Sequence, residues 1–464
     1  MTDFISEMQW RGLIAQTTGE EKLRAHLAGG VRKAYVGFDP TADSLTIGNL
    51  VGIMVLVRFA KAGHQPVVVV GGGTGLIGDP SGKSAERLLL TPEGVDANVR
   101  GQTRIFDAIW KQAGLGTPPI RNNYEWLAKL SYLEALRDVG KHFSVNMMIQ
   151  KESVKERLHN RDQGISYTEF SYMILQAYDY KYLWEHDGVT MQMGGSDQFG
   201  NIVCGADLID KQWNQTVALL AAHEEAQLLA EPTEVQAREQ EIERLERWLA
   251  ERAPLEKHGL TWPLVTKTDG GKFGKTESGA VWLTADRTSP YAFYQFWLNS
   301  ADADIPKFLR IFTLMSEEQV KELDAKHAAN AGAREAHRAL AQHMTTLLHG
   351  EEQMLLAEKA AQALFSGEIA GLPRTTLEEA LASVPSSTHA LEDLEQGVAL
   401  AEFLVKVQLA SSMREAKEFL KNGSVSANGR KVGIDDKLTG ADLLHGSMIA
   451  LRRGKKNWHL TRWE

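Results

Sequence analysis

The chain opens with short apolar runs that alternate with helical patterns. The runs "AYVGF" (Ala34 to Phe38) and "PVVVV" (Pro66 to Val70) have the length and composition of buried strands. Between them, apolar residues recur near helical spacing, at Ile47, Leu50, Val51, Met54 and Val57. A strand, a helix and a second strand predict a βαβ unit with parallel strands.

Two further strands are expected downstream, at "HFSVN" around His142 and at "VTMQM" (Val189 to Met193). Helical patterns lie between them. The first ~210 residues therefore predict an α/β domain with a doubly wound parallel sheet, as in Rossmann-like folds. The N-terminal stretch lacks a basic leader and an apolar core, so we expect an amphipathic first helix and no signal peptide.

Residues 212–257 have a different composition, rich in Glu and Arg. In "AREQEIERLERWLAERA" the apolar stripe is narrow, at Ile242, Leu245 and Leu249, and Glu231-Pro232 separates this piece from an earlier helical pattern. We expect a helical hairpin inserted into the domain, with the charges on its solvated face.

The rest of the chain predicts two more domains. After a Rossmann-like domain over 1–288, which includes the 212–257 insertion and the loop "KFGKT", the pattern becomes helical over 289–385. A small α+β domain is expected over 395–464. It contains a basic helix, "SMREAKEFLK", and a hairpin, "SVSANGRKV", with Asn428-Gly429 as its turn.

Composition narrows the class of protein. The 464 residues are 43% hydrophobic and 24% charged, an ordinary globular balance. No apolar run is long enough to cross a bilayer. The single cysteine, Cys204, excludes an internal disulfide and a thiolate cluster, and suits a cytoplasmic location. No metal ligand is assigned.

Charge is uneven along the chain. The net charge is −9, yet residues 401–464 hold 12 Lys and Arg against 7 Asp and Glu, a balance of +5 that leaves −14 for the rest. A basic tail on an acidic body favours one local anionic partner such as RNA, although a solvated charged face explains the tail equally well. We expect no membrane and no DNA partner.

The stretch "VVVVGGGTGLIGDPSGKS" (Val67 to Ser84) resembles two nucleotide-binding motifs, and context rejects both. "GTGLIG" has the letters of a dinucleotide fingerprint, but it follows the second strand and opens no helix directly. The phosphate-loop pattern before Gly82-Lys83 requires glycine where Ile77 stands, and in "GGKFGKT" it requires glycine where Asp269 stands. The glycines instead let backbone lie close to a ligand.

Two segments that are expected to be helical contain candidate ligand-binding residues. "TIGN" (Thr46 to Asn49) lies at a predicted helix start, which favours anions, although Thr46 as a simple N-cap is an equally plain interpretation. "SYMILQAYDY" places Tyr172, Gln176 and Asp179 on one face of a helix. Without other information, that face also fits a core helix with a few satisfied polar groups.

Long segments of the chain resemble the bacterial tyrosyl-tRNA synthetases, a family of class I aminoacyl-tRNA synthetases. The matching runs follow in the expected order over nearly the whole chain: "YVGFDPTADSLTIGNL", "GGGTGLIGDPSGKSAER", "GKHFSVNMM", "GISYTEFSYMILQAYDY", "GGSDQFGNI", "KFGKTESGAVWL", "SPYAFYQFW" and "LRRGKKNWHL". Typical members lack the 212–257 insertion. The C-terminal segment resembles the RNA-binding fold first named for a small-subunit ribosomal protein.

The resemblance implies a two-step reaction. The carboxylate of tyrosine attacks the α-phosphate of ATP, giving tyrosyl-adenylate and pyrophosphate, and the tyrosyl group then passes to the 3′ end of tRNA(Tyr). Catalysis by positioning and by stabilising phosphate charge suits this reaction, with Mg²⁺ accompanying ATP. The family also implies a homodimer.

The resemblance also assigns roles to residues of this chain. It implies a tyrosine site made of Tyr35, Asp79, Tyr172, Gln176, Asp179, Gln192 and Gln198. It implies an ATP site made of Gly37, Asp39, Thr41, Gly48, Gly195, Asp197 and Lys275. The residues expected to act on the phosphates are Thr46, Asn49, Lys83, Arg87, Lys272, Lys275 and Thr276.

The chain departs from the family at one motif, because Thr46 and Asn49 replace the two histidines of the usual His-Ile-Gly-His. Both replacements can donate hydrogen bonds to phosphate without a charge. This change is the only support for one alternative, a non-catalytic RNA-binding paralogue. A second alternative is a tryptophan-specific relative, against which Tyr35 and Asp179 favour a phenol.

Overall fold

The computed structural model describes residues 3–78, 90–151, 154–155, 158, 165–227, 234–253, 255–268, 270, 273–276, 279–382, 384–455 and 457–464. For Lys275 and Thr276 it describes the backbone alone. The chain divides into two compact units, Met1–Thr284 with Ala301–Ala325, and Ala285–Ser300 with Lys326–Glu464.

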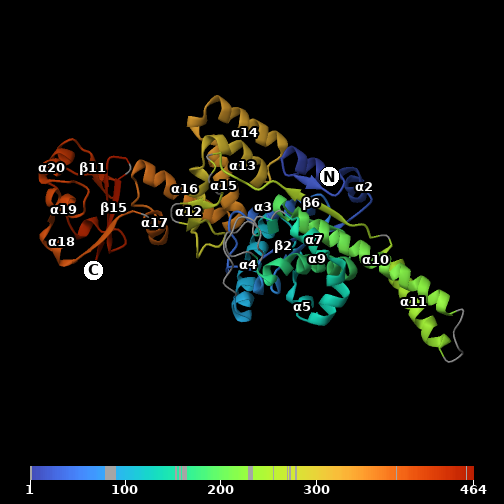
Figure 1. Cartoon of the computed structure of the whole chain (residues 1–464). Helices are drawn as coiled ribbons and strands as arrows, with labels where there is room; N and C mark the ends of the chain where they lie inside the picture. Colours follow the sequence, from blue (N-terminus) through green and yellow to red (C-terminus); the bar gives the residue numbers. More distant parts are fainter. Residues whose placement is uncertain are drawn as a thin grey trace. The chain divides into compact units, whose positions relative to one another are not determined.

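The first unit is built on a six-stranded sheet in the order β1-β6-β5-β2-β3-β4 (Figure 1). Its strands are β1 (Gln16–Thr17), β2 (Lys33–Phe38), β3 (Gln65–Val70), β4 (Ile120–Asn122), β5 (Met191–Gly195) and β6 (His258–Trp262). All neighbours are parallel except β1, which pairs antiparallel with β6 at the edge. The predicted doubly wound α/β fold is confirmed.

Helices cover the sheet because their apolar side chains pack against the apolar side chains of its strands. The connection from β2 to β3 is α3 (Leu50–Lys61), in which every residue from Leu50 to Phe59 is buried. The other helices of this part are α1 (Phe4–Trp10), α2 (Glu20–Ala28), α4 (Pro92–Gln112), α5 (Tyr124–Leu127), α6 (Tyr132–Glu134) and α9 (Tyr167–Asp187). Short 3-10 turns, η1 (Thr74–Leu76) and η4 (Ser196–Gln198), follow β3 and β5.

One strand prediction is wrong. The segment "HFSVN" forms no strand: the chain runs through η2 (Ala135–Val139) and η3 (Gly140–His142) into α7 (Val145–Ile149). The reason lies in packing, because Phe143 and Met147 contact an apolar cluster of Val139, Ala177, Cys204 and Leu208. These apolar side chains meet helices of the same unit and leave no role for an added strand.

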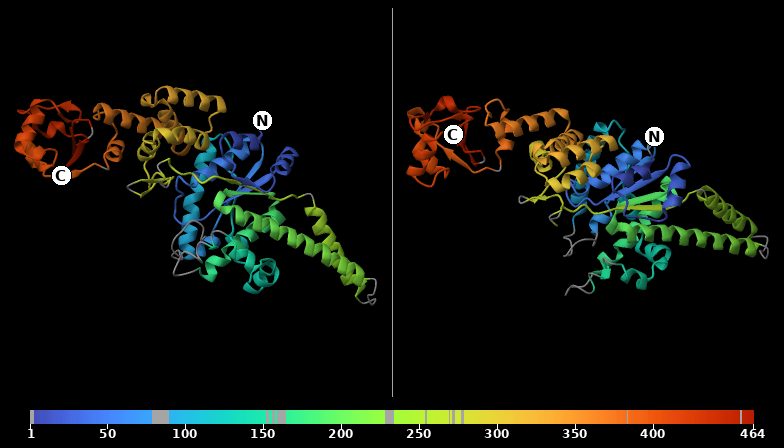
Figure 2. Two further views of the ribbon diagram at one scale, coloured as in Figure 1. Left: turned by 45° about the horizontal axis from the view of Figure 1, so that its top comes forward. Right: turned by 90° about the horizontal axis from the view of Figure 1, so that it is seen from above.

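The predicted helical hairpin is present, but its first helix begins within the α/β domain, before residue 212. A single helix, α10 (Phe199–Gln227), starts directly after η4, and α11 (Val235–Arg252) packs against it (Figure 2). Of the predicted stripe Leu245 is fully buried. At the base, the Trp248 ring lies 5.9 Å from that of Trp213 and 6.2 Å from that of Trp184. Glu231-Pro232 lies outside the described residues.

Four small elements complete the first unit. They are the two-stranded sheet of β7 (Lys275–Thr276) and β8 (Gly279–Ala280), the turn η5 (Asp302–Asp304) and helix α13 (Ile305–Phe312). Helix α14 (Glu317–Ala329) runs on to the boundary with the second unit.

The second unit begins with helices, as the pattern predicted. The first is α12 (Pro290–Leu298). After the turn η6 (Ala331–Ala333) come α15 (Glu335–His349), α16 (Glu351–Ser366) and α17 (Arg374–Ala380). A five-stranded sheet follows in the order β12-β11-β14-β15-β9, from β9 (Ser386–His389), β11 (Val425–Ala427), β12 (Arg430–Lys431), β14 (Met448–Arg453) and β15 (Asn457–Trp463). Its companions are α18 (Glu392–Gln396), α19 (Leu400–Lys406), α20 (Met413–Lys421), η7 (Gly440–Asp442), β10 (Val398–Ala399) and β13 (Lys437–Leu438).

The C-terminal helix and hairpin are confirmed at the expected positions. The basic helix is α20, and β11 pairs antiparallel with β12. The turn between them has φ of 49° at Asn428 and 91° at Gly429, the left-handed values that an Asn-Gly hairpin turn uses. Across the described part of the chain, no helix is both long and apolar enough to cross a membrane.

Candidate active site

A cavity of about 510 Å³ opens at the carboxyl ends of β2, β3, β5 and β6, where open α/β sheets bind their ligands. It brings together side chains that are far apart in the sequence. The predicted site residues that line it are Tyr35, Gly37, Asp39, Thr41, Thr46, Gly48, Asn49, Tyr172, Gln176, Asp179, Gln192, Gly195, Asp197 and Gln198.

The predicted residues that remain lie partly or wholly outside the described residues. Asp79, Lys83, Arg87 and Lys272 are not among them, and Lys275 and Thr276 are described by backbone alone. Their predicted roles therefore stay predictions.

The deep end of the cavity holds two buried polar groups, Tyr35 and Asp179. The Tyr35 hydroxyl has no hydrogen-bond partner among the described residues. The Asp179 carboxylate accepts hydrogen bonds from Asn123 Nδ2 at 3.0 Å and from Trp126 Nε1 at 2.7 Å. Burial raises the pKa of the Asp179 carboxyl to about 7, and these two bonds oppose that rise.

Burial also raises the pKa of the Tyr35 hydroxyl, with a smaller contribution from the nearby Asp179 carboxylate. Tyr35 therefore stays protonated and can both donate and accept a hydrogen bond. A ligand hydroxyl placed here would satisfy the unpartnered phenol and use the remaining acceptor capacity of the carboxylate.

Asn123 and Trp126 are site residues that the sequence analysis did not find. Asn123 follows β4 and also bonds the glycine loop, because its Oδ1 accepts from Gly73 N at 2.7 Å and its Nδ2 lies 3.0 Å from Thr74 Oγ1. The signal available was weak: a polar "NN" pair at the end of a short strand that could border the site. The pairing of β4 with β3 joins distant segments and could not be predicted from local sequence patterns.

The backbone of the glycine loop packs closely against neighbouring side chains of the site. A side-chain carbon on Gly71 would lie 2.5 Å from Thr74 Oγ1 and 2.6 Å from Asp39 Oδ1. The structure therefore leaves no room for a larger residue at this position. Asp39 in turn accepts from the Tyr172 hydroxyl, 3.3 Å from each carboxylate oxygen.

Side-chain amides form a connected group on the opposite wall. Gln176 Nε2 donates to Gln198 Oε1 at 3.2 Å, Asn201 Nδ2 donates to Gln176 Oε1 at 2.9 Å, and Gln198 Nε2 donates to Asp197 Oδ2 at 3.1 Å. Gln192 Oε1 is buried and has no partner among the described residues. The wall thus offers both donors and an unused acceptor to a polar ligand.

The "TIGN" segment lies directly before α3, and Asn49, not Thr46, is its N-cap residue. Asn49 Oδ1 accepts from the Thr46 hydroxyl at 2.9 Å and from Thr46 N at 3.0 Å. The prediction of a helix start therefore holds within a few residues, and the N-cap interpretation of Thr46 is wrong. Among the described residues, a side-chain carbon on Gly37 would meet no atom within 4 Å, so the backbone there lies open to the cavity.

The "KFGKT" loop contacts this same segment. Gly274 has φ of 80°, and a side-chain carbon on it would lie 2.5 Å from Ile47 Cγ2. Val281 links the two, since its N donates to Gly274 O and its O accepts from Ile47 N, both at 3.0 Å. On the loop's other side the Phe273 ring lies 5.1 Å from the rings of Phe308 and Phe312 on α13.

Comparison with protein families shows which class of protein has a chain of this kind. The family "tRNA synthetases class I (W and Y)" matches residues 29–366, which hold the whole cavity. The family "Tyrosine--tRNA ligase SYY-like C-terminal domain" matches residues 376–461.

Proteins of similar sequence identify the family within this class of synthetases. The chain is 43% identical over 463 residues to the tyrosine–tRNA ligase of Bacillus caldotenax, covering 99% of this chain and 100% of the relative. It is 44% identical over 464 residues to that of Dechloromonas aromatica, covering 99% of each. The chain belongs to the tyrosyl-tRNA synthetases, within the class I tRNA synthetases.

A solved structure agrees with this membership. A C-terminally truncated mitochondrial tyrosyl-tRNA synthetase of Aspergillus nidulans matches with a TM-score of 0.64 at 26% identity. The match covers 79% of this chain and 95% of that one.

Proposed function

We propose that this chain activates L-tyrosine with ATP and transfers the tyrosyl group to the 3′ end of tRNA(Tyr). The observation that carries the proposal is the deep end of the cavity, where the unpartnered Tyr35 hydroxyl and the Asp179 carboxylate are buried together. The full-length relatives named as tyrosine–tRNA ligases support it.

The phenol of tyrosine suits this end of the cavity. Its hydroxyl can donate to Asp179 and accept from Tyr35, which satisfies both buried groups. Phenylalanine would leave them desolvated and unpaired, at a cost of about 1–3 kcal/mol for each unsatisfied group. The pocket therefore selects tyrosine through the penalty that it imposes on competitors.

The amino acid's ammonium and the nucleotide lie nearer the cavity mouth in this proposal. Tyr172 and Gln176, with Asp79, face the ammonium, and Gln192 and Gln198 lie beside it. Gly37, Gly48 and Gly195 let ATP approach the backbone, while Asp197 holds the ribose and Asp39 and Thr41 line the path to the phosphates. All of these residues except Asp79, which lies outside the described residues, line the cavity, and this supports their roles.

The phosphate chemistry is assigned to hydrogen-bond donors and cations. Thr46 and Asn49 contact phosphate oxygens at the start of α3, where backbone N–H groups also favour anions. Lys83, Arg87, Lys272, Lys275 and Thr276 stabilise the pyrophosphate as it leaves. The contact between Gly274 and Ile47 supports the loop assignment, because it places the backbone of "KFGKT" beside "TIGN".

Mg²⁺ is proposed to arrive with the ATP phosphates. The one group of three potential metal ligands among the described residues lies outside the cavity, which fits an ion carried by the nucleotide and not held by the protein. Mg²⁺ would neutralise phosphate charge as pyrophosphate forms.

The C-terminal region is proposed to grip tRNA. Helix α20 carries Arg414, Lys417 and Lys421 around a surface hollow, and the region has a surplus of positive charge. Such a surface holds RNA through its phosphates, so binding should weaken steeply as salt rises.

A homodimer is proposed on an exposed apolar surface of the first unit. Tyr132, Leu133, Leu136, Val145 and Ile149 lie on α6, η2 and α7 and are 38–77% exposed. Clustered exposure of this kind typically marks a protein interface. Sedimentation should give a dimer, and Leu133→Glu should give a monomer.

A cytoplasmic location is also proposed, since the buried Cys204 thiol remains reduced in the cytoplasm.

ATP–pyrophosphate exchange tests the activation step and separates the alternatives. Exchange dependent on tyrosine supports the proposal. Exchange dependent on tryptophan alone would favour the tryptophan-specific relative, and no exchange with any amino acid would favour the RNA-binding paralogue.

A further inference from the structure

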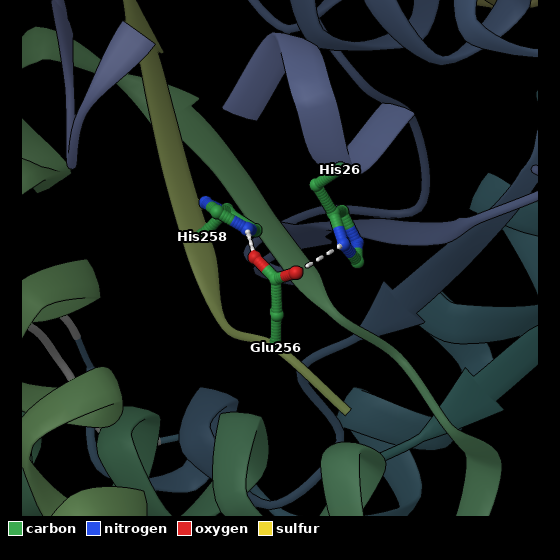
Figure 3. A group of neighbouring side chains, drawn as sticks. All are labelled: His26, Glu256 and His258. Atoms are coloured by element: carbon green, nitrogen blue, oxygen red, sulfur yellow. Dashed lines mark hydrogen bonds and ion pairs between the residues drawn. The ribbon is translucent and has the colours of Figure 1, made fainter. Parts of the chain in front are cut away.

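Two buried histidines and a glutamate meet at the end of the sheet opposite the cavity (Figure 3). His26 comes from α2, His258 begins β6, and Glu256 precedes it. The cavity lies at the carboxyl end of the same β6, where Trp262 and Leu264 line it. Trp262 lies four positions after His258 along the strand, a distance of roughly 13 Å.

We propose that His26, Glu256 and His258 form a binding site for a divalent transition metal ion of the Zn²⁺ type. Two imidazoles and one carboxylate are ligands that such an ion takes, with a water molecule completing a tetrahedral set. The proposal does not depend on the tyrosine activity.

The distances between the ligand atoms are close to those that the ion requires. His258 Nε2 lies 2.9 Å from Glu256 Oε2, His26 Nδ1 lies 3.7 Å from Glu256 Oε1, and all three ligand atoms fall within 4.8 Å of one another. In a tetrahedral site with bonds of about 2.1 Å, neighbouring ligand atoms lie about 3.4 Å apart. A small movement of the exposed Glu256 side chain would complete the set.

The first histidine is already oriented for binding. His26 Nε2 lies 2.8 Å from Thr190 Oγ1, and the Thr190 hydroxyl is directed to Lys33 O at 3.5 Å. With a metal ion on Nδ1, the remaining ring proton would lie on Nε2 and would donate to Thr190 Oγ1. Metal-bound histidines typically donate their second N–H to such an acceptor.

The second histidine sits on a rigid backbone. Its N donates to Thr190 O at 2.8 Å, and the Tyr180 hydroxyl donates to its O at 2.9 Å. Both imidazoles are buried, with His26 3% and His258 5% exposed, so their ring positions are held by the surrounding fold.

The surrounding charges do not prevent binding. Arg32, Lys22 and Lys257 are the cations that act on the two histidines. Lys257 is paired with Asp210 at 2.6 Å, and Glu256 supplies a negative charge within the ligand set. Glu256 follows α11, so a bound ion would fasten the root of the α10–α11 hairpin to α2.

Equilibrium dialysis of the full chain against Zn²⁺, with metal analysis of the protein, tests the proposal. We expect one tightly bound ion per chain and a higher unfolding temperature with Zn²⁺ than with a chelator. His258→Gln and Glu256→Gln should each weaken binding at least about tenfold, since each removes a ligand. Glu256 is exposed, so Glu256→Gln should fold normally and keep its exchange activity.

The matched control is His186→Gln, an exposed histidine on α9, which should bind Zn²⁺ as the unchanged chain does. Absence of stoichiometric binding to the unchanged chain would overturn the proposal. Equal binding by the unchanged chain and Glu256→Gln would also overturn it, because the ion would then occupy another site.

Discussion

Asn123 donates a 3.0 Å hydrogen bond through Nδ2 to the buried carboxylate of Asp179. The bond ties the residue after β4 to the middle of α9 and lowers the pKa of that carboxyl against the effect of burial. It holds the carboxyl group in place at the deep end of the cavity.

Removing that donor should weaken tyrosine binding. Asn123→Ala leaves the Asp179 carboxylate with one fewer partner, which should cost about 1–3 kcal/mol of stability and reduce tyrosine affinity about tenfold. Equilibrium dialysis with labelled tyrosine measures the affinity. Asn214→Ala, an exposed change on α10, is the matched control. Unchanged tyrosine affinity in Asn123→Ala would show that the bond does not orient the carboxylate.

Asp179 should make stability depend on pH. Its folded pKa of about 7 lies above the usual value of 3.8, so the folded state binds more protons than the unfolded state between these values. Protonated Asp179 therefore stabilises the folded state at low pH, and this contribution to the free energy of unfolding is lost as pH rises through 7. Each unit of difference between the folded and unfolded pKa corresponds to about 1.4 kcal/mol. Urea unfolding of the wild type and of Asp179→Asn, compared from pH 5 to 8, measures it. A stability difference that stays constant over this range would contradict the shift.

Gly274 should be required for docking of the "KFGKT" loop. Gly274→Ala places a methyl group 2.5 Å from Ile47 Cγ2 at a φ of 80°. Gly270 has φ of 78°, and no atom of the described residues lies within 4 Å of the carbon that Gly270→Ala adds. Both changes incur the backbone cost of about 1–2 kcal/mol, and only Gly274→Ala adds the collision. Pre-steady-state formation of tyrosyl-adenylate should slow at least tenfold more in Gly274→Ala than in Gly270→Ala. Equal rates would contradict the contact.

Thr46 should act on the phosphates and not on tyrosine. Thr46→Ala removes the hydroxyl that donates to Asn49 at 2.9 Å, and with it a donor near the α3 N-terminus. Loss of one such donor should lower the activation rate about 10²-fold with little change in tyrosine affinity. Thr46→Ser, which keeps the hydroxyl, should recover most of the rate. An unchanged activation rate in Thr46→Ala would remove Thr46 from the mechanism.

Residue spacing alone predicted the part of the site that lies on one helix, whereas the cavity residues on other elements were predicted from the family resemblance. Tyr172, Gln176 and Asp179 share one helical face by spacing alone, and all three line the cavity. Asn123 and Trp126 could not be found in that way, because their role depends on β4 lying beside β3, a pairing between distant segments. The error at "HFSVN" has a similar cause, since Phe143 packs on helices that only the fold brings near.

Selection of tyrosine over phenylalanine by the Tyr35 and Asp179 pair is the central claim. The direct measurement is the ratio of kcat/KM for the two amino acids in ATP–pyrophosphate exchange, in the wild type and in Tyr35→Phe. We predict strong preference for tyrosine in the wild type and a ratio about tenfold smaller in Tyr35→Phe, because one hydrogen bond to the substrate hydroxyl is lost. An identical ratio in both proteins, or exchange with phenylalanine as efficient as with tyrosine, would contradict the account.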